Sequence, residues 1–319
     1  MPVYNRWRIE VPAIFNFPRS PCKSTKGKTE MKTCKTLLLV PTLVLAFMIS
    51  AVAANAPTLT FKFKTIRVPG ALTTALNGIN NAGVMVGLYI DKPGYQRGFM
   101  LNGKTLTRID HPHGSQTVCW QINSKGAIVG GYTDAGGKGK GFLYQSGKFT
   151  TIPGPRGALY SQANGINDAG LIVGGYATSS GYSQGFVLKG KTYTTLNVPG
   201  ALATVAEGIN NQGDIVLDWL DSAGNSESSL YNGKTYKTIN VPNAVQTMAR
   251  DINTAGDIAY QWFSNDFSGH GALFHKGKYY TFDCSNSMGT AANGLNDKNR
   301  IVGFCEPNNN YEGGFVATY

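Results

Sequence analysis

The sequence predicts an all-β protein in which one unit of four strands is repeated along the chain. The first observation is composition: 40 Gly, 16 Tyr and 15 Phe among 319 residues, with only 15% charged residues, suit short strands and tight turns better than surface helices. The second is the phrase "NGINNAGVMVG" at residues 77–87, which returns in five further versions. A chain of this length can form one large domain or two, so the repeat decides the organisation.

The phrase returns at a nearly constant interval. The asparagine that follows its isoleucine or leucine serves as a marker, and successive markers lie 43 or 44 residues apart. A repeat of about 40 to 45 residues that contains four strands is typical of a propeller blade. The chain is therefore predicted to be a six-bladed β-propeller with four strands in each blade. The markers are Asn80, Asn123, Asn167, Asn210, Asn253 and Asn296.

The four strands can be assigned within the first repeat. Residues 73–79 alternate in hydrophobicity and lead into a turn at 80–83, and residues 84–90 are a run of strand formers. The third and fourth strands are predicted at 97–102 and 104–110. In the turn, the asparagine side chain is expected to cap its own backbone, and the glycine to adopt a positive φ. The repeated phrase is thus the first hairpin of each blade.

The two ends of the repeat region are predicted to share one blade. The sixth repeat reaches only its third strand at Tyr319, while residues 59–68 read like a fourth strand placed before the first repeat. Ile66 lies 14 residues before Asn80, the interval that also separates other fourth strands from the next marker. We expect the N-terminal strand to complete the last blade, which removes open sheet edges and makes residues 59–319 one domain.

Positions that are equivalent in all six repeats predict which side chains pack between blades. Each marker is preceded by Ile or Leu and followed six residues later by Val or Ala. In four repeats the third strand carries phenylalanine: Phe99, Phe142, Phe186 and Phe315. Nine residues after the marker stands a position that we interpret as a packing belt rather than a binding platform: Tyr89, Tyr132, Tyr176, Trp219, Trp262 and Cys305.

The N-terminal residues have the pattern of an exported protein. Residues 1–30 precede Met31 and are interpreted as an upstream extension or disorder. Residues 31–56 combine "KTCK", an apolar run and "SAVAANA", the pattern of a secretory signal peptide with its cleavage site. The alternative is an uncleaved membrane anchor, but the apolar run is short for a bilayer span. We expect a secreted, periplasmic or cell-surface protein with no stable membrane insertion after cleavage.

Export places the cysteines of the repeat region in an oxidising compartment. Cys119 lies on a predicted inner strand and is expected to be a buried thiol. Cys284, in the link before the sixth blade, and Cys305, 21 residues later, are predicted to form a disulfide. The alternative is that both remain buried thiols.

Charge does not indicate a nucleic-acid partner. Of the net charge of +11, residues 1–56 carry +6, so +5 is spread over the rest of the chain without a basic block. In five repeats a lysine follows the second-hairpin glycine, but neighbouring outer hairpins of a six-bladed ring would lie roughly 20 Å apart, beyond a Debye length of about 8 Å. These lysines are interpreted as isolated solubilising charges: Lys104, Lys148, Lys191, Lys234 and Lys278.

The pattern "INxxGxIVGxY", followed by a Gly-Phe strand, resembles the HAF-repeat proteins found outside bacterial cells. The family is named for a His-Ala-Phe step, whose nearest counterpart here is "HGALF" at residues 270–274. The resemblance covers all six repeats, with Gly in place of Ala in "RGF", "KGF" and "QGF". It implies a secreted, propeller-like repeat protein of largely unassigned role and supplies no catalytic residues.

One end of the propeller is predicted to carry the binding residues. The second-to-third loops and the fourth-to-first links share this end and differ between repeats, whereas the hairpins at the opposite end are nearly uniform. Aromatic planes interspersed with hydrogen-bonding groups would suit a polysaccharide or a protein loop. The alternative is that these loops vary because little packs against them. The predicted binding residues are Tyr95, Arg97, His111, His113, Arg156, Tyr160, Tyr182, Asp221, His270 and Tyr311.

No catalytic, metal or cofactor site is predicted. The "HPH" at 111–113 cannot fill a tetrahedral shell, the Asp-led loops lack the series of oxygens that calcium needs, and no nucleophile or phosphate-binding motif stands out. The sequence therefore favours a monomeric binding or structural module without a cofactor, whose ligand is a glycan or a protein.

The alternative function is that of a propeller hydrolase or lyase acting on a carbohydrate or a lactone. Its polar cluster would consist of His111, His113, Arg156 and His270. Clustering of these side chains around the central channel would favour the enzyme, because propeller active sites combine residues from distant blades. Dispersal of the four would favour a binding module.

Overall fold

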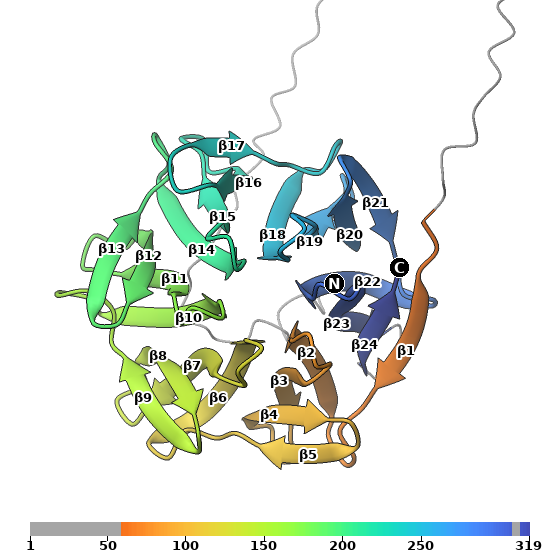
Figure 1. The fold of residues 1–319 in the computed structure, drawn as a ribbon, viewed down its shortest axis with the longest axis horizontal. Helices are drawn as coiled ribbons and strands as arrows, with labels where there is room; N and C mark the ends of the chain where they lie inside the picture. The colour runs from red at the N-terminus through yellow and green to blue at the C-terminus, as the bar shows by residue number, and fades with distance from the viewer. Residues whose placement is uncertain (1–58, 308–312) are drawn as a thin grey trace, which may run out of the picture. The chain divides into compact units, whose positions relative to one another are not determined.

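In the computed structural model, the described residues are 59–307 and 313–319. Over these residues the chain forms 24 strands and no helix, arranged as an all-β propeller around a central axis (Figure 1). No helix long and apolar enough to cross a membrane occurs in this part of the chain. The predicted extension at 1–30 and signal peptide at 31–56 lie outside the described residues.

The strands form five sheets, of which four contain four consecutive strands paired in chain order. The first of these sheets contains β2 (Thr73–Ile79), β3 (Met85–Ile90), β4 (Gln96–Asn102) and β5 (Thr105–Arg108), and the second contains β6 (Gly114–Ile122), β7 (Ile128–Asp134), β8 (Gly139–Gln145) and β9 (Lys148–Ile152). The third contains β10 (Tyr160–Ile166), β11 (Ile172–Ala177), β12 (Ser183–Lys189) and β13 (Thr192–Leu196). The fourth contains β14 (Ala203–Ile209), β15 (Ile215–Leu220), β16 (Ser226–Tyr231) and β17 (Tyr236–Thr238). The fifth sheet has eight strands: β1 (Lys62–Ile66), β18 (Gln246–Ile252), β19 (Ile258–Phe263), β20 (Gly269–His275), β21 (Lys278–Phe282), β22 (Ser287–Leu295), β23 (Arg300–Pro307) and β24 (Gly313–Thr318).

The eight-stranded sheet differs from the prediction of separate four-stranded blades. One parallel pair, between Gly269 in β20 and Gly289 in β22, joins the set β18–β21 to the set formed by β22–β24 and β1. Both partners are glycine, so no Cβ keeps the two backbones apart at this point. A Cβ on Gly289 would lie only 2.8 Å from Oε2 of Glu306.

The N-terminal strand pairs with the last strand, as the sequence predicts. β1 runs antiparallel to β24, in a register that places Lys62 opposite Thr318 and Ile66 opposite Gly314 (Figure 1). The ring of Phe63 packs edge-on against that of Phe315, with centroids 5.2 Å apart. Because β1 covers the outer side of β24, that strand presents no unpaired row of backbone groups there.

The predicted strands of the first repeat are confirmed within two residues. β2 matches residues 73–79, and β5 is the largest difference, since it covers 105–108 instead of 104–110. The registered core positions are also confirmed, because the Ile or Leu before each marker, the Val or Ala six residues after it, and the four third-strand phenylalanines are all buried. Spacing alone therefore identifies the side chains that pack between neighbouring sheets.

Each first strand contains a bulge that the sequence analysis did not predict. In β2 the register shifts between Leu76 and Gly78, so the residue three positions before the marker has no partner on β3. The same shift occurs in all six first strands. A bulge bends its strand and re-aims the unpaired side chain. The six bulge residues are Asn77, Trp120, Asn164, Glu207, Arg250 and Asn293.

The fourth-to-first links are held by a hydroxyl group on the first strand. Oγ1 of Thr74 accepts a hydrogen bond from the backbone N–H of Val68 at 2.9 Å. Equivalent bonds hold four other links: Thr117 with His111, Thr204 with Val198, Thr247 with Val241, and Thr290 with Cys284. In the third repeat Pro155 has no N–H to donate, and Ser161 donates instead to the carbonyl of Ile152 at 2.7 Å. The links are thus fixed to the sheets rather than free.

Cys284 and Cys305 form a disulfide, with their Cα atoms 5.9 Å apart. It joins the link before β22 to β23 within the last repeat. The equivalent positions of the second repeat hold His111 and Tyr132, whose rings stack with centroids 3.5 Å apart. The disulfide therefore occupies a place where another repeat has a packing contact. Cys119 is a free and buried thiol, as predicted.

Reduction of this disulfide is expected to lower the free energy of unfolding by about 3 kcal/mol, because a closed loop of 21 residues restricts the unfolded chain. The measurement is urea unfolding with and without a phosphine reductant. A double variant, Cys284→Ala with Cys305→Ala, should unfold at the reduced midpoint under both conditions. A wild-type midpoint that does not respond to the reductant would contradict the expectation.

Candidate functional site

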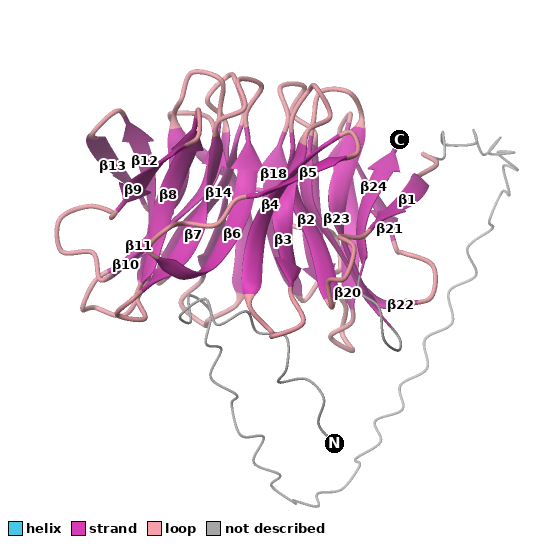
Figure 2. Ribbon diagram, turned by 90° about the horizontal axis from the view of Figure 1, so that it is seen from below, coloured by secondary structure: helices cyan, strands magenta, loops and turns pink. Residues whose placement is uncertain are grey.

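The loops and turns gather at the two ends of the strands (Figure 2). We call the end with the marker turns, such as residues 80–83, the asparagine end. The end with the fourth-to-first links, such as residues 67–72, is the link end. The predicted binding residues belong to the link end.

Each marker asparagine caps its own turn and also bonds to the next repeat. Oδ1 of Asn80 accepts from the backbone N–H groups of Ala82 and Val84 at 3.1 and 3.0 Å, which is the predicted cap. Its Nδ2 donates to the backbone carbonyl of Asn123 at 3.1 Å. A carboxylate could cap the turn but could not make this second bond, because it has no N–H to donate.

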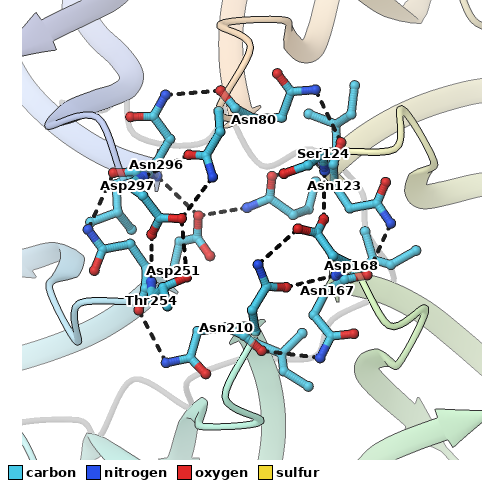
Figure 3. Close-up of a pocket in the computed structure, with 18 of the residues that line it drawn as sticks. Asn80, Asn123, Ser124, Asn167, Asp168, Asn210, Asp251, Thr254, Asn296 and Asp297 are labelled. Carbon is cyan, nitrogen blue, oxygen red and sulfur yellow. Dashed lines mark hydrogen bonds between the residues drawn. The ribbon is translucent and has the colours of Figure 1, made fainter.

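The six marker asparagines close a circuit of hydrogen bonds around the axis (Figure 3). Each Nδ2 donates to the backbone carbonyl of the next marker at 2.9 to 3.3 Å, and Asn296 donates to Asn80. All six side chains are buried. The circuit ties every repeat to both of its neighbours at the asparagine end.

Two carboxylates at the positions after the markers add further bonds between repeats (Figure 3). Asp168 accepts from the backbone N–H of Ser124 at 2.8 Å and from Nδ2 of Asn211 at 2.9 Å. Asp297 accepts from the backbone N–H of Thr254 at 2.7 Å and from Nδ2 of Asn81 at 2.8 Å. These carboxylates bridge their neighbours and are committed to structural bonds.

One pair of side chains reaches across the axis. Nε2 of Gln121 donates to Oδ2 of Asp251 at 2.6 Å, although the two residues are 130 positions apart, and Leu295 N–H donates to the same oxygen at 3.0 Å. Burial raises the pKa of Asp251 to about 7. The other four repeats have glycine at this position, and a Cβ on Gly78 or Gly208 would lie 2.5 or 2.8 Å from the crossing pair. Only two side chains therefore fit at this level.

The asparagine end also holds a small hollow of about 60 Å³, with the crossing pair among its lining residues (Figure 3). Its lining is made of the marker asparagines, the residues before and after them, and the pair Gln121 and Asp251. A volume of this size holds about two water molecules. None of the ten predicted binding residues lines it. The hollow is thus lined by the residues that hold neighbouring repeats together.

At the link end, the predicted binding residues Tyr95 and Arg97 lie beside each other. Nε of Arg97 bonds to Asp91 at 2.8 Å, and its Nη1 reaches Asp110, in the link that follows β5, at 3.4 Å. The guanidinium also lies 5.0 Å from the centre of the Tyr95 ring, which is 50% exposed. The bond to Arg97 lowers the pKa of Asp91, so this carboxyl stays charged. The result is an exposed aromatic ring beside a fixed group of charges; we call these four residues the rim cluster.

His270 occupies the equivalent strand position four repeats later and has similar partners. Its ring stacks on Trp262, with centroids 4.5 Å apart, and Nδ1 bonds to Asp283 at 2.9 Å. Its Nε2 lies 3.1 Å from the hydroxyl of Ser264. As at Arg97, an aromatic ring and a carboxylate of the following link contact one nitrogen-bearing side chain.

His111 is a packing residue rather than an exposed ligand-binding side chain. It is 5% exposed and stacks on Tyr132, and its Nδ1 accepts from the backbone N–H of His113 at 3.3 Å. Burial, followed by the charge of His113, lowers the pKa of His111, so the ring is neutral at neutral pH. The equivalent residue is valine in three repeats, namely Val68, Val198 and Val241, which marks this as a core position.

The remaining predicted residues do not join one site. Asp221 caps its own loop through Ala223 and Asn225, both at 2.8 Å, while Arg156, Tyr182 and His113 are exposed in three different loops. Tyr160 is buried on a first strand, and its hydroxyl donates to Gln162. Tyr311 lies outside the described residues.

The histidines and arginine proposed for an enzyme are dispersed. His111 and His113 are neighbours, with ring centroids 5.9 Å apart, but His270 is bonded to Ser264 and Asp283. Over residues 59–307 and 313–319, no group of three or more His, Cys, Asp or Glu could hold a metal ion. By the criterion set from the sequence, this arrangement favours a binding module.

No protein-family model and no curated protein matches the chain. Solved structures share its fold. AofleA from Arthrobotrys oligospora superposes with a TM-score of 0.51 at 10% identity and covers 81% of this chain and 86% of its own. SapL1 lectin, in complex with alpha methyl fucoside, has a TM-score of 0.53 at 13% identity, with coverages of 78% and 93%. A mutant of Aleuria aurantia lectin, in complex with alpha-methyl-L-fucoside, has a TM-score of 0.50 at 13% identity, with coverages of 79% and 93%. This chain is therefore similar in fold to propeller lectins.

Proposed function

We propose that this chain is an exported, monomeric β-propeller of the HAF-repeat kind that binds saccharides at its link end. We assign six blades to it, closed by β1. The assignment is supported by the circuit of six marker asparagines and by the pairing of β1 with β24. Saccharide binding agrees with the fucoside complexes of two lectins that share the fold.

The rim cluster is the observation that carries the proposal. A sugar ring has an apolar face that stacks on an aromatic plane, and hydroxyl groups that both donate and accept. Tyr95 offers the plane, Arg97 offers N–H donors, and Asp91 and Asp110 offer acceptors; Arg97 lies against each of the other three. Because the two carboxylates already hold Arg97 in place, little side-chain freedom is lost when a ligand binds.

The experiment is a glycan and peptide array probed with the secreted protein and with Tyr95→Ala and Arg97→Gln. Each substitution is expected to weaken glycan binding at least about tenfold, the loss of one charge-assisted hydrogen bond or one stacked ring. Leu106→Ala serves as the matched control, because Leu106 is 40% exposed on the outer strand β5. Unchanged glycan binding by both rim variants, or binding to peptides alone, would overturn the proposal.

A further inference from the structure

The six bulge residues form a layer around the axis, next to the crossing pair. Asn293 donates to Oδ1 of Asn77 at 3.2 Å and to the carbonyl of Leu76 at 3.0 Å, so these side chains contact each other across neighbouring first strands. Asn77 in turn donates to the carbonyl of Cys119 at 2.9 Å. On this side of the layer, these bonds give partners to both amide NH2 groups and to Oδ1 of Asn77.

The other side of the layer is built differently. Nδ2 of Asn164 donates to the carbonyl of Ala206 at 3.1 Å and to Oε2 of Glu207 at 3.2 Å, but its Oδ1 has no partner, although the side chain is only 7% exposed. Nε of Arg250 is also buried without a partner. Unpaired buried polar atoms are costly, so each requires an explanation. The free acceptor on β10 and the free donor on β18 lie on either side of β14, which carries Glu207, and together they indicate a ligand.

The charges on this side do not neutralise each other by contact. Nη2 of Arg250 donates to Gln261 at 3.1 Å, and none of the ion pairs within the described ranges joins Arg250 to Glu207. Asp218 already has partners, since it accepts hydrogen bonds from the backbone N–H of Ala249 at 2.9 Å and from the hydroxyl of Ser228 at 2.8 Å. Glu207 and Arg250 are therefore the charged groups left for a ligand.

Aromatic side chains border the same place. Burial raises the pKa of Tyr160, and the charge of Glu207 raises it further, which places this carboxylate near the phenol. The indole nitrogen of Trp120 and Cγ of Gln162 both lie 3.8 Å from the point where a Cβ on Gly131 would stand. Trp120 and Glu207 keep part of their surface exposed. The layer thus combines an indole with polar groups that solvent reaches.

We propose that Trp120, Asn164, Glu207 and Arg250, which we call the axial cluster, bind a second saccharide through two adjacent hydroxyl groups. Each hydroxyl both donates and accepts, so the pair can donate to Asn164 Oδ1 and Glu207 and accept from Arg250 Nε. The sugar enters from the link end, because Gln121 and Asp251 cross the axis on the other side. The axial cluster rests on the proposed saccharide function but uses none of the rim residues.

The test uses the intact secreted chain with methyl α-L-fucoside, methyl α-D-mannoside and glycine as probes. Binding is followed by tryptophan fluorescence and by calorimetry. One of the glycosides is expected to saturate the signal, and Glu207→Gln to weaken binding at least about tenfold. Glu306→Gln is the matched control, since Glu306 is another partly buried glutamate. Trp120→Phe should remove the fluorescence change while calorimetry still detects binding.

Three outcomes would overturn the axial cluster: a Kd unchanged by Glu207→Gln, saturation by glycine instead of a glycoside, or no saturable signal with any probe. Should Glu207→Gln not fold, Asn164→Ser carries the same test. The rim and axial sites are separable. Loss of binding in Tyr95→Ala but not in Glu207→Gln supports the rim alone, and the reverse pattern supports the axial cluster alone.

Discussion

Replacing Asn167 by alanine is expected to lower the free energy of unfolding by about 3 to 5 kcal/mol. The side chain is 4% exposed and makes three hydrogen bonds: it accepts from Ala169 and Leu171 at 3.1 and 3.0 Å, and donates to Asn210 at 3.1 Å. Alanine leaves two N–H groups and a carbonyl without these partners. Urea unfolding followed by circular dichroism gives the change directly.

One further variant separates the two roles of Asn167, and another serves as a control. Asn167→Asp keeps the turn-capping oxygen and loses only the donor to Asn210, so its loss should be smaller than that of alanine. Asn225→Ala is the surface control, because Asn225 bonds to Asp221 in an exposed loop. Equal effects of Asn167→Ala and Asn225→Ala would show that the circuit of marker asparagines does not stabilise the fold.

The free energy of unfolding is expected to fall as the pH rises from 5 to 9, and Asp218→Asn to remove much of this dependence. Burial raises the pKa of Asp218 to about 8 in the folded state, against 3.8 for the free side chain. Between these values the folded protein holds a proton that the unfolded chain has lost, so stability decreases with pH. The stabilisation present at pH 5 and lost at pH 9 is on the order of 2 to 4 kcal/mol.

Asparagine is a suitable replacement because it mimics the protonated acid: its Oδ1 can still accept from Ser228 and Ala249. The comparison is Asp266→Asn. Bonds from Ser264 and Ser268 lower the pKa of Asp266 to about 2, so it stays charged from pH 5 to 9. Asp266→Asn should therefore change the free energy of unfolding by the same amount at every pH from 5 to 9, and leave its dependence on pH unchanged. A wild-type curve that rises over this range would contradict the assignment of Asp218.

Much of the fold was predictable because it depends on local patterns. Alternation, turn residues and an interval of 43 or 44 residues identify the strands, the core positions and the pairing of β1 with β24. The turn-capping role of the marker was predictable for the same reason. Its bond to the next repeat was missed, although the choice of residue was a signal. Aspartate would also cap the turn, yet all six markers are asparagine, the residue that can donate.

The residues on the axis were harder to predict. Three of the six bulge residues are asparagine and the other three are Trp120, Glu207 and Arg250, so no motif marks the charged ones. Their meeting depends on which strands become neighbours. The crossing pair left a weak signal, since Gln121 and Asp251 interrupt a position that is glycine elsewhere. His111 was assigned to binding because it is a polar residue in a link that varies between repeats, whereas comparison with the equivalent valines identifies it as core. Position within the repeat was thus more informative than residue type.

The direction of the asparagine bonds has a consequence for how many copies the propeller can hold. Every amide donates toward the following copy, so the six bonds run in one rotational sense and the cycle has neither a first donor nor a last acceptor. Each bond polarises the next, and the cycle is strong only while it is unbroken. A duplicated or deleted copy would change the angle between neighbouring copies, so every amide would have to reach its carbonyl in a new geometry for the cycle to close again.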